Sequence, residues 1–457
     1  MKIKISNKEY RIIRRRILSM ILPITIESIL QMTTSIISMA MVGRISPVAV
    51  GAIGIGTNIF NIIWALFKGI STGVSVLVAQ AYGANNYYKL RKVAVQTLMF
   101  SIILVIIFQQ GIYWNTSKIL EIFDTSEELM ESSSIYLRII SWGLPFITIV
   151  LIVAGVFQGM GNAKTPMKVA LAMNVVNVIL SYIFIFGKLR LNPMGVKGAG
   201  YATVISQIVA ATIGLIILFG KEGLLKSENG FSLKMDFKQI LSVYRVGLPV
   251  SCERIFWQIA SIVLTKAILT YGEIAYASYQ LGLQAESISY MPAAGFSVAA
   301  TTFIGHAIGS GNAEEGEKYL YQLIKWTTVF TLFTGGLLVF FPKQIMRMLT
   351  EDIDIINTGA VYLFVMGIVQ MPQNLRGVID GALRGAGYAK PPTAIAMVGL
   401  CCIRLPLSLM CAYVLKSPIW SIWVVFGIDL IFRFICNVIV FKRKDIFSKG
   451  KILIGVE

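Results

Sequence analysis

Long runs of apolar residues alternate with short polar segments along almost the whole chain. Twelve of these runs are near or above the roughly 20 residues that a helix needs to cross a bilayer. Several contain Gly or Pro, which membrane helices tolerate when neighbouring helices satisfy the freed backbone groups. The pattern therefore predicts an all-α polytopic membrane protein. Its twelve predicted transmembrane helices lie near residues 17–39, 50–80, 93–114, 135–157, 166–187, 197–220, 243–269, 275–306, 318–341, 357–382, 393–415 and 418–441.

The composition agrees with a chain that lies in lipid. Of the 457 residues, 56% are hydrophobic and only 14% are charged, whereas a soluble domain carries about a quarter charged residues. In a soluble protein, the formal net charge of +18 would suggest a nucleic-acid partner. Here the Lys and Arg residues fall mostly between the apolar runs, so we expect the lipid bilayer as a partner and no nucleic acid.

The distribution of basic residues predicts how the chain is oriented. No signal-peptide pattern follows the basic segment 1–16, so we expect the first apolar run to stay as a helix and the N-terminus to be cytoplasmic. The inner segments then carry most of the Lys and Arg, as cytoplasmic loops do. We therefore expect a multi-pass protein of the plasma (cytoplasmic) membrane with both termini in the cytoplasm. The acidic loop 121–131 then lies outside.

An internal repeat organises the chain. Pro23 and Pro249 are 249 − 23 = 226 residues apart, and the same offset matches Glu27 with Glu253. Chance similarity of apolar residues would not keep Gly, Pro and Glu in one register. Further matches at this offset are Gly56 with Gly282, Gly69 with Gly295, Gly83 with Gly309, Asn86 with Asn312, Lys92 with Lys318, Tyr136 with Tyr362, Gly155 with Gly381, Gly159 with Gly385, Lys164 with Lys390 and Pro166 with Pro392.

The repeat predicts the domain organisation. Each half holds six helices, an even number, so both halves enter the membrane in the same orientation. This implies two six-helix bundles related by a pseudo-two-fold axis along the membrane normal, with substrate sites between them. We expect an N-lobe at 17–220 with helices 1–6 and a C-lobe at 243–441 with helices 7–12. The basic segment 1–16, the linker 221–242 and the basic tail 442–457 are expected in the cytoplasm.

Several strings in both halves resemble one transporter family, multidrug and toxic compound extrusion (MATE). The resemblance covers about residues 15 to 440, and the strings stand in the family's order on a doubled chain. It implies two bundles facing a central cavity and cation-coupled export by alternating access, and it does not fix the substrate. We expect a monomer with no cofactor beyond the coupling ion, and small organic cations or drugs as the substrate. The strings are "GISTGVSVLVAQAYGANN" (69–86), "FQGMGNAKTPM" (157–167), "NVVNVILSYIFIFG" (174–187), "GVKGAGYATVISQ" (195–207), "YQLGLQAESISYMPAAGFSVAATTFIGHAIGSGN" (279–312) and "GALRGAGYAKPP" (381–392).

Two matched acidic residues are candidates for a coupling site. Glu27 and Glu253 each follow the proline of the first helix of their half by four residues. One further turn along lie Gln31 and Trp257, on the same helix faces. A carboxylate beside an amide or an indole suits a protonatable site for a cation, because the indole face also attracts lipophilic cations.

These carboxylates also have a structural interpretation. A charge within a span is costly, so it faces a cavity or pairs with a partner. Glu253 could be held by Arg254 or Lys266, and then it would only stabilise helix packing.

Other ionisable residues in the second half are further candidates. Glu286 has Tyr290 at i+4 and Gln284 nearby, and it belongs either to the coupling site or to a helix–helix hydrogen bond. Arg376 and Asp380 are spaced i, i+4, which favours an internal pair, although a role in binding stays open.

Four more residues have structural interpretations or no assigned role. Asp429 and Arg433 repeat the i, i+4 spacing, and we interpret them as a structural pair. His306 is either a proton relay or a polar group near a helix end. Lys68 has no charged counterpart in the second half, and the sequence assigns it no role.

A polar stripe marks the fifth predicted helix. Asn174, Asn177 and Ser181 lie at i, i+3 and i+7, so they share one face that should turn toward the bundle interior. In the MATE family this face helps to bind a cation within the first bundle.

The sequence departs from the family at its usual cation-binding acids. Ser38 and Ser181 stand where many members carry Asp, and Trp257 and Gln373 stand where others carry acids in the second half. The coupling ion is therefore left open between H⁺ and Na⁺, with a Na⁺ site near Glu253 or Asn177 as one alternative. The carboxylates that remain as candidates are Glu27, Glu253 and Glu286.

Other function classes are less compatible with these residues. There is no H-E-x-x-H motif, no paired catalytic carboxylates and no Ser-His-Asp framework, so we expect no enzyme. A membrane scaffold would not need Glu at matched intramembrane positions. A lipid-linked oligosaccharide flippase of the same superfamily is the alternative, and it would favour a cavity rich in cationic residues. The expected function is efflux of small organic cations in exchange for H⁺ or Na⁺.

Overall fold

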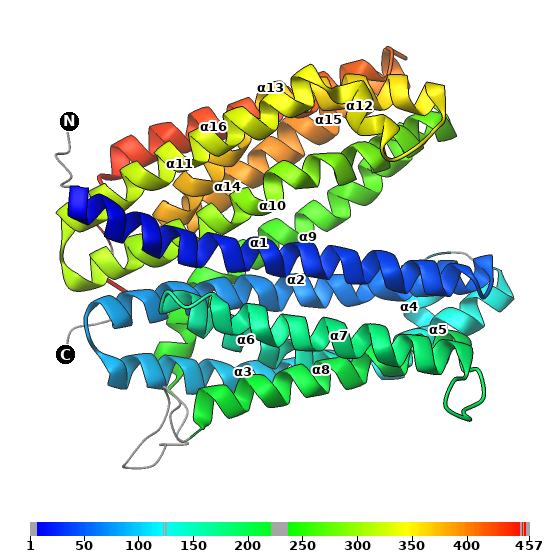
Figure 1. The fold of residues 1–457 in the computed structure, drawn as a ribbon, viewed down its shortest axis with the longest axis horizontal. Helices are drawn as coiled ribbons and strands as arrows, with labels where there is room; N and C mark the ends of the chain where they lie inside the picture. The colour runs from blue at the N-terminus through cyan, green and yellow to red at the C-terminus, as the bar shows by residue number, and fades with distance from the viewer. Residues whose placement is uncertain are drawn as a thin grey trace. The chain divides into compact units, whose positions relative to one another are not determined.

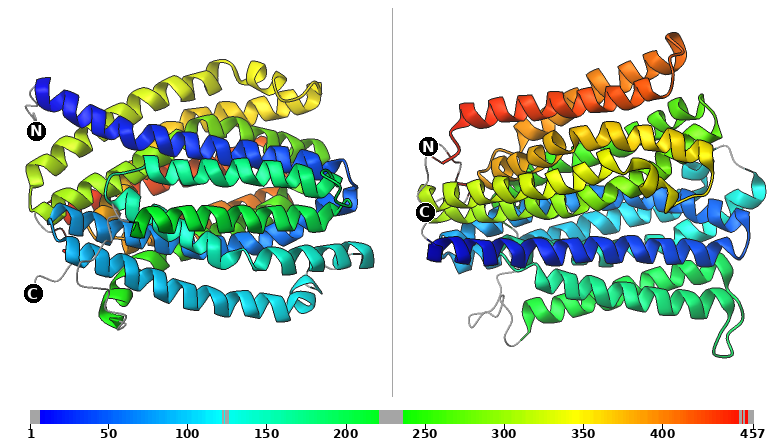
Figure 2. Two further views of the ribbon diagram at one scale, coloured as in Figure 1. Left: turned by 60° about the horizontal axis from the view of Figure 1, so that its bottom comes forward. Right: turned by 45° about the horizontal axis from the view of Figure 1, so that its top comes forward.

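A computed structural model describes residues 7–121, 123, 126–220, 236–447, 450 and 452–453, and every regular element in this part is helical. Figure 1 labels the helices along the chain, and Figure 2 shows them from two further sides. The first half forms α1 (Asn7–Gly43), α2 (Pro47–Gly83), α3 (Tyr87–Trp114), α4 (Thr116–Glu121), α5 (Glu127–Ser141), α6 (Leu144–Gly159), α7 (Lys164–Phe186) and α8 (Gly195–Phe219).

The second half repeats this order. Its short helix α12 starts 342 − 116 = 226 residues after α4, at the offset of the sequence repeat. The elements are α9 (Phe237–Leu269), α10 (Glu273–Ser310), α11 (Ala313–Phe340), α12 (Pro342–Arg347), α13 (Ile353–Gly385), α14 (Lys390–Val398), η1 (Gly399–Arg404), α15 (Leu405–Leu409), η2 (Met410–Val414) and α16 (Trp420–Lys444).

The helices follow the twelve predicted spans in order. Ten stretches of the described chain are long and apolar enough to cross a membrane. An eleventh is the bent pair of α5 and α6, which meet at 48° where one continuous helix was predicted at 135–157. Pro145, in the first turn of α6, accounts for this break because it cannot donate a backbone hydrogen bond. The remaining long helix, α9, has 33 residues and carries the charges of Glu253 and Arg254 within it.

The predicted eleventh span, 393–415, is continuous but not uniform. It runs through α14, η1, α15 and η2, and the two η elements are π-helical turns. A π-helical turn widens the backbone helix, and such turns are frequent at functional sites. Arg404 ends the first of them, η1.

Contacts divide the chain into two compact units. The C-unit comprises Met1–Thr25, Ala79–Asn85 and Cys252–Glu457, and the N-unit comprises Ile26–Val78 and Asn86–Ser251. α1 therefore passes from the C-unit to the N-unit after Thr25, and α9 passes from the N-unit to the C-unit after Ser251. Both transitions lie two residues beyond an intrahelical proline, Pro23 or Pro249.

The predicted lobe boundaries stay predictions. α1 already begins at Asn7, so part of the segment predicted at 1–16 continues the first helix. Residues 1–6 of that segment, 221–235 of the predicted linker 221–242, and 448–449, 451 and 454–457 of the predicted tail lie outside the described residues.

Each unit has its own packed interior. In the C-unit, α13 contacts α10, α11 and α16, and these helices run side by side in Figures 1 and 2. Tyr279, Tyr362, Trp423 and Phe426 form an aromatic cluster among them. In the N-unit, α8 contacts α5, α6 and α7, and α6 also contacts α3.

Glycines of the repeat make the same close helix contact in each unit. A Cβ built on Gly159 of α6 would lie 2.7 Å from the carbonyl oxygen of Ser75 in α2. A Cβ built on Gly385 of α13 would lie 2.5 Å from the carbonyl oxygen of Thr301 in α10. Both pairs keep the 226-residue offset, since 301 − 75 = 385 − 159 = 226. The repeat therefore preserves glycine where two helix backbones approach closely.

We expect Gly159→Ala and Gly385→Ala each to destabilise the protein, because the added methyl group forces the two helices apart. Overpacking of this kind costs roughly 1–3 kcal/mol. The measurement is the thermal midpoint of the detergent-solubilised protein. Gly111→Ala is the control, because a Cβ there meets nothing within 4 Å. Equal midpoints for all three variants would contradict the proposed close packing.

Candidate functional site

A buried carboxylate on α10 is the centre of the candidate site in the C-unit. Glu286 is 3% exposed. The Tyr362 hydroxyl donates a hydrogen bond to its Oε2 at 2.6 Å. Gln370 Nε2 donates to Oε1 at 2.9 Å and Gln373 Nε2 donates to the same oxygen at 3.3 Å. Three neutral donors thus surround this carboxyl group.

The fold of α13 explains how these donors converge. Gln370 and Gln373 are three residues apart, so they share a helix face, and Tyr362 lies about two turns earlier. The Tyr362 ring is held by Trp423, with ring centroids 5.0 Å apart, and it lies directly against the backbone face of Gly282. The aromatic cluster therefore positions the hydroxyl group that contacts Glu286.

A second acidic residue lies between two arginines. Asp429 of α16 accepts from Arg404 Nε at 2.7 Å and from Arg433 Nε at 2.6 Å. Because Gly399 has no side chain, it leaves room for both Asp429 and Arg433; a Cβ there would clash with them. The predicted Asp429–Arg433 pair is confirmed, and Arg404 completes it from the π-helical turn η1.

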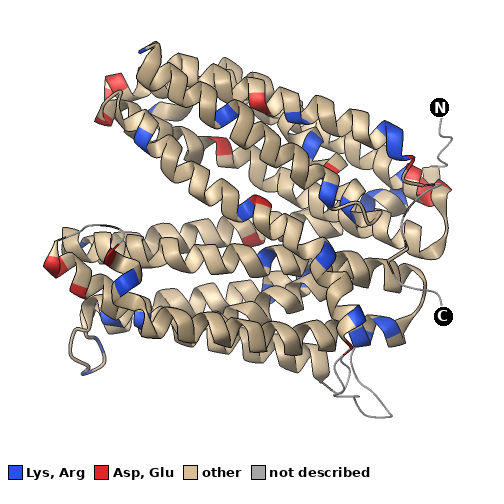
Figure 3. Ribbon diagram, turned by 180° about the vertical axis from the view of Figure 1, so that it is seen from behind, with Lys and Arg blue, Asp and Glu red and all other residues tan. Residues whose placement is uncertain are grey.

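Two further ion pairs lie on α13. Arg376 pairs with Asp380 at 2.8 Å, as the i, i+4 spacing predicted. Glu253 of α9 pairs with Arg384 Nη2 at 2.9 Å. The sequence suggested Arg254 or Lys266 as the partner of Glu253, and the structure shows Arg384 instead. Figure 3 shows that acidic and basic residues occur within the helices as well as at their ends.

In the N-unit, Glu27 is partly buried, and its Oε2 has no hydrogen-bond partner among the described residues. The positive charge that acts on Glu27 is that of Lys68 on α2. The sequence assigned Lys68 no role, so this placement is new. Gln31, one turn beyond Glu27, is exposed.

The predicted polar stripe of the fifth span lies on α7. Asn174 and Ser181 are buried. Asn177 accepts from Ser38 Oγ at 3.3 Å and donates to Thr203 Oγ1 at 3.4 Å. These contacts join α1, α7 and α8 through hydroxyl and amide groups. Across the described residues, no group of three or more His, Cys, Asp and Glu side chains could hold a metal ion.

Other predicted site residues do not donate hydrogen bonds to Glu286, although Tyr290 interacts with it electrostatically. Gln284 is exposed, and Tyr290 is 41% exposed although it is one turn from Glu286. Trp257 is 40% exposed and its ring centroid lies 5.0 Å from the guanidinium carbon of Arg404. His306 lies near the ring of Tyr82, with ring centroids 5.0 Å apart.

Sequence reasoning missed Gln370 and Arg384 as partners of the acidic residues. A signal for Gln370 was present, because Gln370, Gln373 and Asn374 form a polar stripe at i, i+3 and i+4. The same periodicity had indicated the stripe on α7. No sequence pattern links Arg384 to Glu253, which is 131 residues away.

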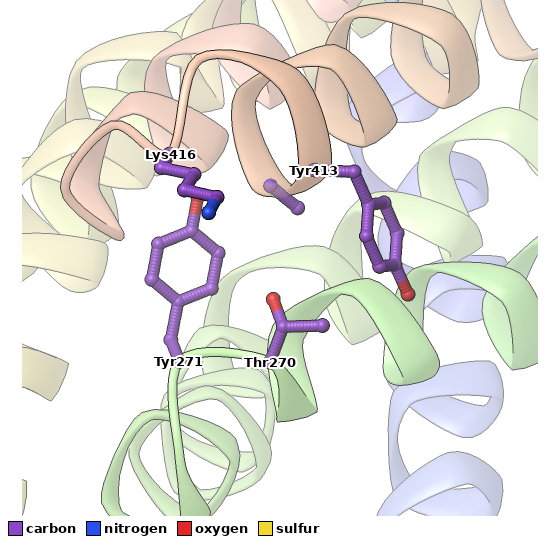
Figure 4. Close-up of a pocket in the computed structure, with 5 residues that line it drawn as sticks. Thr270, Tyr271, Tyr413 and Lys416 are labelled. Atoms are coloured by element: carbon purple, nitrogen blue, oxygen red, sulfur yellow. The ribbon is translucent and has the colours of Figure 1, made fainter.

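A pocket of about 390 Å³ opens where α9 and η2 end. Figure 4 shows Thr270, Tyr271, Tyr413 and Lys416 around it. None of the acidic residues described above lines this pocket.

Comparisons with known proteins agree on one family. The family model described as MatE matches residues 23–183 and 249–410. A probable multidrug resistance protein NorM of Thermotoga maritima is 29% identical over 422 residues, which cover 92% of this chain and 90% of the relative. The probable multidrug resistance protein YoeA of Bacillus subtilis is 26% identical over 438 residues, which cover 93% and 94%.

A solved structure shows the same fold. It is an outward-facing multidrug resistance MATE family transporter of the MOP superfamily, with a TM-score of 0.85 and 21% sequence identity. The likeness covers 96% of this chain and 97% of that one. The all-α membrane fold with twelve spans in two bundles, predicted from the sequence, is therefore confirmed.

We expect Tyr362→Phe to lower the thermal midpoint of the solubilised protein, because it removes the 2.6 Å hydrogen bond to Glu286. Hydrogen bonds to charged groups contribute roughly 1.5–3 kcal/mol. Tyr321→Phe is the matched control, since Tyr321 is 50% exposed. The same midpoint in both variants would show that the bond to Glu286 does not stabilise the fold.

Proposed function

This chain belongs to the MatE family of multidrug and toxic compound extrusion transporters, and we propose that it exchanges small organic cations for H⁺ or Na⁺. The family supports a multi-pass membrane protein that exports drugs. The coupling ion, the cationic cargo and the alternating-access cycle are the finer parts of the proposal. The proposal also includes a monomeric state, location in the plasma membrane and cytoplasmic termini.

The proposal rests on one difference among the acidic residues of the C-unit: three of them have an arginine as ion-pair partner, and Glu286 has none. Glu253, Asp380 and Asp429 each have an arginine within 2.9 Å. Glu286 accepts its hydrogen bonds from neutral donors and has no ion pair among the described residues. The positive charge of Arg404 acts on it from beyond ion-pair distance, and Arg404 is itself bound to Asp429. A carboxylate without a counter-ion in a membrane interior is costly when charged. Glu286 is therefore the acid with most to gain from binding a proton or a cation.

The amide groups beside Glu286 suit either coupling ion. Gln370 Oε1 and Gln373 Oε1 are buried and have no hydrogen-bond partner among the described residues. A protonated Glu286 could donate to such an oxygen after an amide rotates. Na⁺ could instead use the carboxylate and amide oxygens, since hard cations prefer oxygen ligands.

Loading and release of this ion would drive the transport cycle. A ligand shifts a conformational equilibrium only by its difference in affinity for the two states. An ion that neutralises Glu286 better in one state would therefore favour that state. Organic cations are suitable cargo because carboxylates and exposed aromatic rings such as Trp257 attract them.

Glu27 is the second proposed coupling residue. Lys68 supplies a fixed positive charge to it within the N-unit. We prefer Glu286 as the primary ion site because two amide groups that could also bind an ion contact it. Asn174, Asn177 and Ser181 form the other polar region of the N-unit, and a Na⁺ site there would depend on neutral oxygens.

One observation favours the alternative, a flippase for lipid-linked oligosaccharides. Such a protein would favour cationic residues along its cavity, and Arg254 has no acidic partner within hydrogen-bonding distance in the described chain. Arg376, Arg384, Arg404 and Arg433 are each ion-paired, so among these five arginines only Arg254 would offer an unpaired charge.

The test is transport in proteoliposomes loaded with ethidium, under an imposed pH gradient and then a Na⁺ gradient. We expect one gradient to drive ethidium transport and Glu286→Gln to reduce it at least about tenfold, which corresponds to roughly 1.4 kcal/mol. Glu27→Gln and Glu253→Gln are measured in parallel. We expect a smaller loss in Glu253→Gln, because Glu253 is already paired with Arg384.

Glu273→Gln is the matched control, because it makes the same change in the exposed first turn of α10. Full activity of Glu286→Gln would move the coupling site elsewhere and leave the family assignment intact. Failure of every gradient to move any cation, with the protein folded, would favour the flippase.

A further inference from the structure

Arg254 lies within the long helix α9. Its side chain has no hydrogen bond and no ion pair with the described residues. Its Nε is buried and has no acceptor. The adjacent carboxylate, Glu253, is already bound to Arg384 at 2.9 Å. Arg254 therefore carries five donor N–H groups for which the described chain supplies no acceptor.

The surroundings of Arg254 are positive overall. Glu253, Arg254, Arg376, Asp380 and Arg384 act on one another electrostatically, and we call them the arginine cluster. Its three guanidinium groups face two carboxylates, and those carboxylates are bound to Arg376 and Arg384. The unbalanced charge is that of Arg254, and Arg384 adds to the positive potential around it.

The internal repeat provides a control for the role of this cluster. The first half builds the matching helices with the same glycine contacts, yet it carries neutral residues at four of the five matching positions. The fold therefore does not require these charges. At the offset of 226, Arg254 matches Ser28, Arg376 matches Val150, Asp380 matches Ala154, Arg384 matches Gln158, and only Glu253 matches an acid, Glu27.

We propose that Arg254 is the anion-binding group of a cargo site, and that it binds a carboxylate carried by the exported molecule. A guanidinium fork matches a carboxylate through two parallel hydrogen bonds. Phe256 and Trp257, on the same stretch of α9, are each 40% exposed and provide an apolar surface for the body of the molecule. The preferred cargo is then an aromatic zwitterion rather than a simple cation.

The assignment to cargo rests on the proposed transport function, whereas the anion site itself does not. Ligand binding to the solubilised protein tests the anion site without any gradient. Transport in proteoliposomes tests the function separately.

The experiment uses two dyes that differ in one group. Rhodamine 110 has a free carboxylate, and rhodamine 123 is its methyl ester. Fluorescence anisotropy in a neutral detergent measures the affinity of each dye for the full chain. We expect wild type to bind rhodamine 110 roughly tenfold or more tightly than rhodamine 123, as expected for hydrogen bonds to a charged group.

Arg254→Gln should abolish this preference without changing the affinity for rhodamine 123. Arg254→Lys should keep part of the preference, because it retains the charge without the planar fork. Lys266→Gln, with the same loss of charge 12 residues further along α9, is the control and should keep the full preference. If Arg254→Gln does not fold, the relative affinity of Arg254→Lys for the two dyes is used instead. A weaker preference for rhodamine 110 than that of wild type then supports the proposal.

Equal affinity of wild type for the two dyes would overturn the proposal, whatever the variants show. So would an unchanged preference in Arg254→Gln or, if that variant does not fold, in Arg254→Lys. Displacement of rhodamine 110 by phosphatidylglycerol, but not by phosphatidylcholine, would replace the cargo with a lipid headgroup. If rhodamine 110 binds as expected but no gradient moves either dye, the anion site stands and the proposed transport function fails.

Discussion

The interior of a bilayer contains no water, and this governs how the charged side chains within the helices are arranged. A charge there needs a partner from the protein, because lipid supplies none. Asp429 meets this requirement with two arginines, and Asp380 and Glu253 each meet it with one. Glu286 and Arg254 have no ion pair among the described residues, and they have opposite signs. These two side chains are therefore the ones in the C-unit that we expect to respond to an ion or a ligand.

Comparison of the two halves distinguishes the packing contacts that both share from the charged residues that occur in the second half. Gly159 and Gly385 make the same backbone contact in their own units, so helix packing was kept in both halves. Tyr136 and Tyr362 likewise each lie against a matched glycine, Gly56 or Gly282. Glu286, in contrast, matches Phe60 in the first half. The second half kept the packing of the first and placed a set of charges inside it.

Local patterns predicted the fold, and contacts distant in sequence determined most of the site. Twelve apolar runs were enough to place the spans, because length and hydropathy are local properties. The i, i+4 pairs Arg376–Asp380 and Asp429–Arg433 were predicted for the same reason. The Glu253–Arg384 and Tyr362–Glu286 contacts join residues on different helices, and single-sequence periodicity has no information on helix pairing. The bend between α5 and α6 was missed because an apolar run continues through it.

The division of α1 and α9 between the two units has a consequence for the evolutionary origin of the chain. Neither unit is a continuous piece of sequence, since the C-unit includes Met1–Thr25 and the N-unit extends to Ser251. A cut in the predicted linker would therefore leave each half without a helix segment that its unit uses. Two separate copies of a single repeat that exchanged the same segments would form a domain-swapped dimer. Such a dimer would be the natural ancestor of this fused chain, because fusion makes an exchange between two molecules permanent within one.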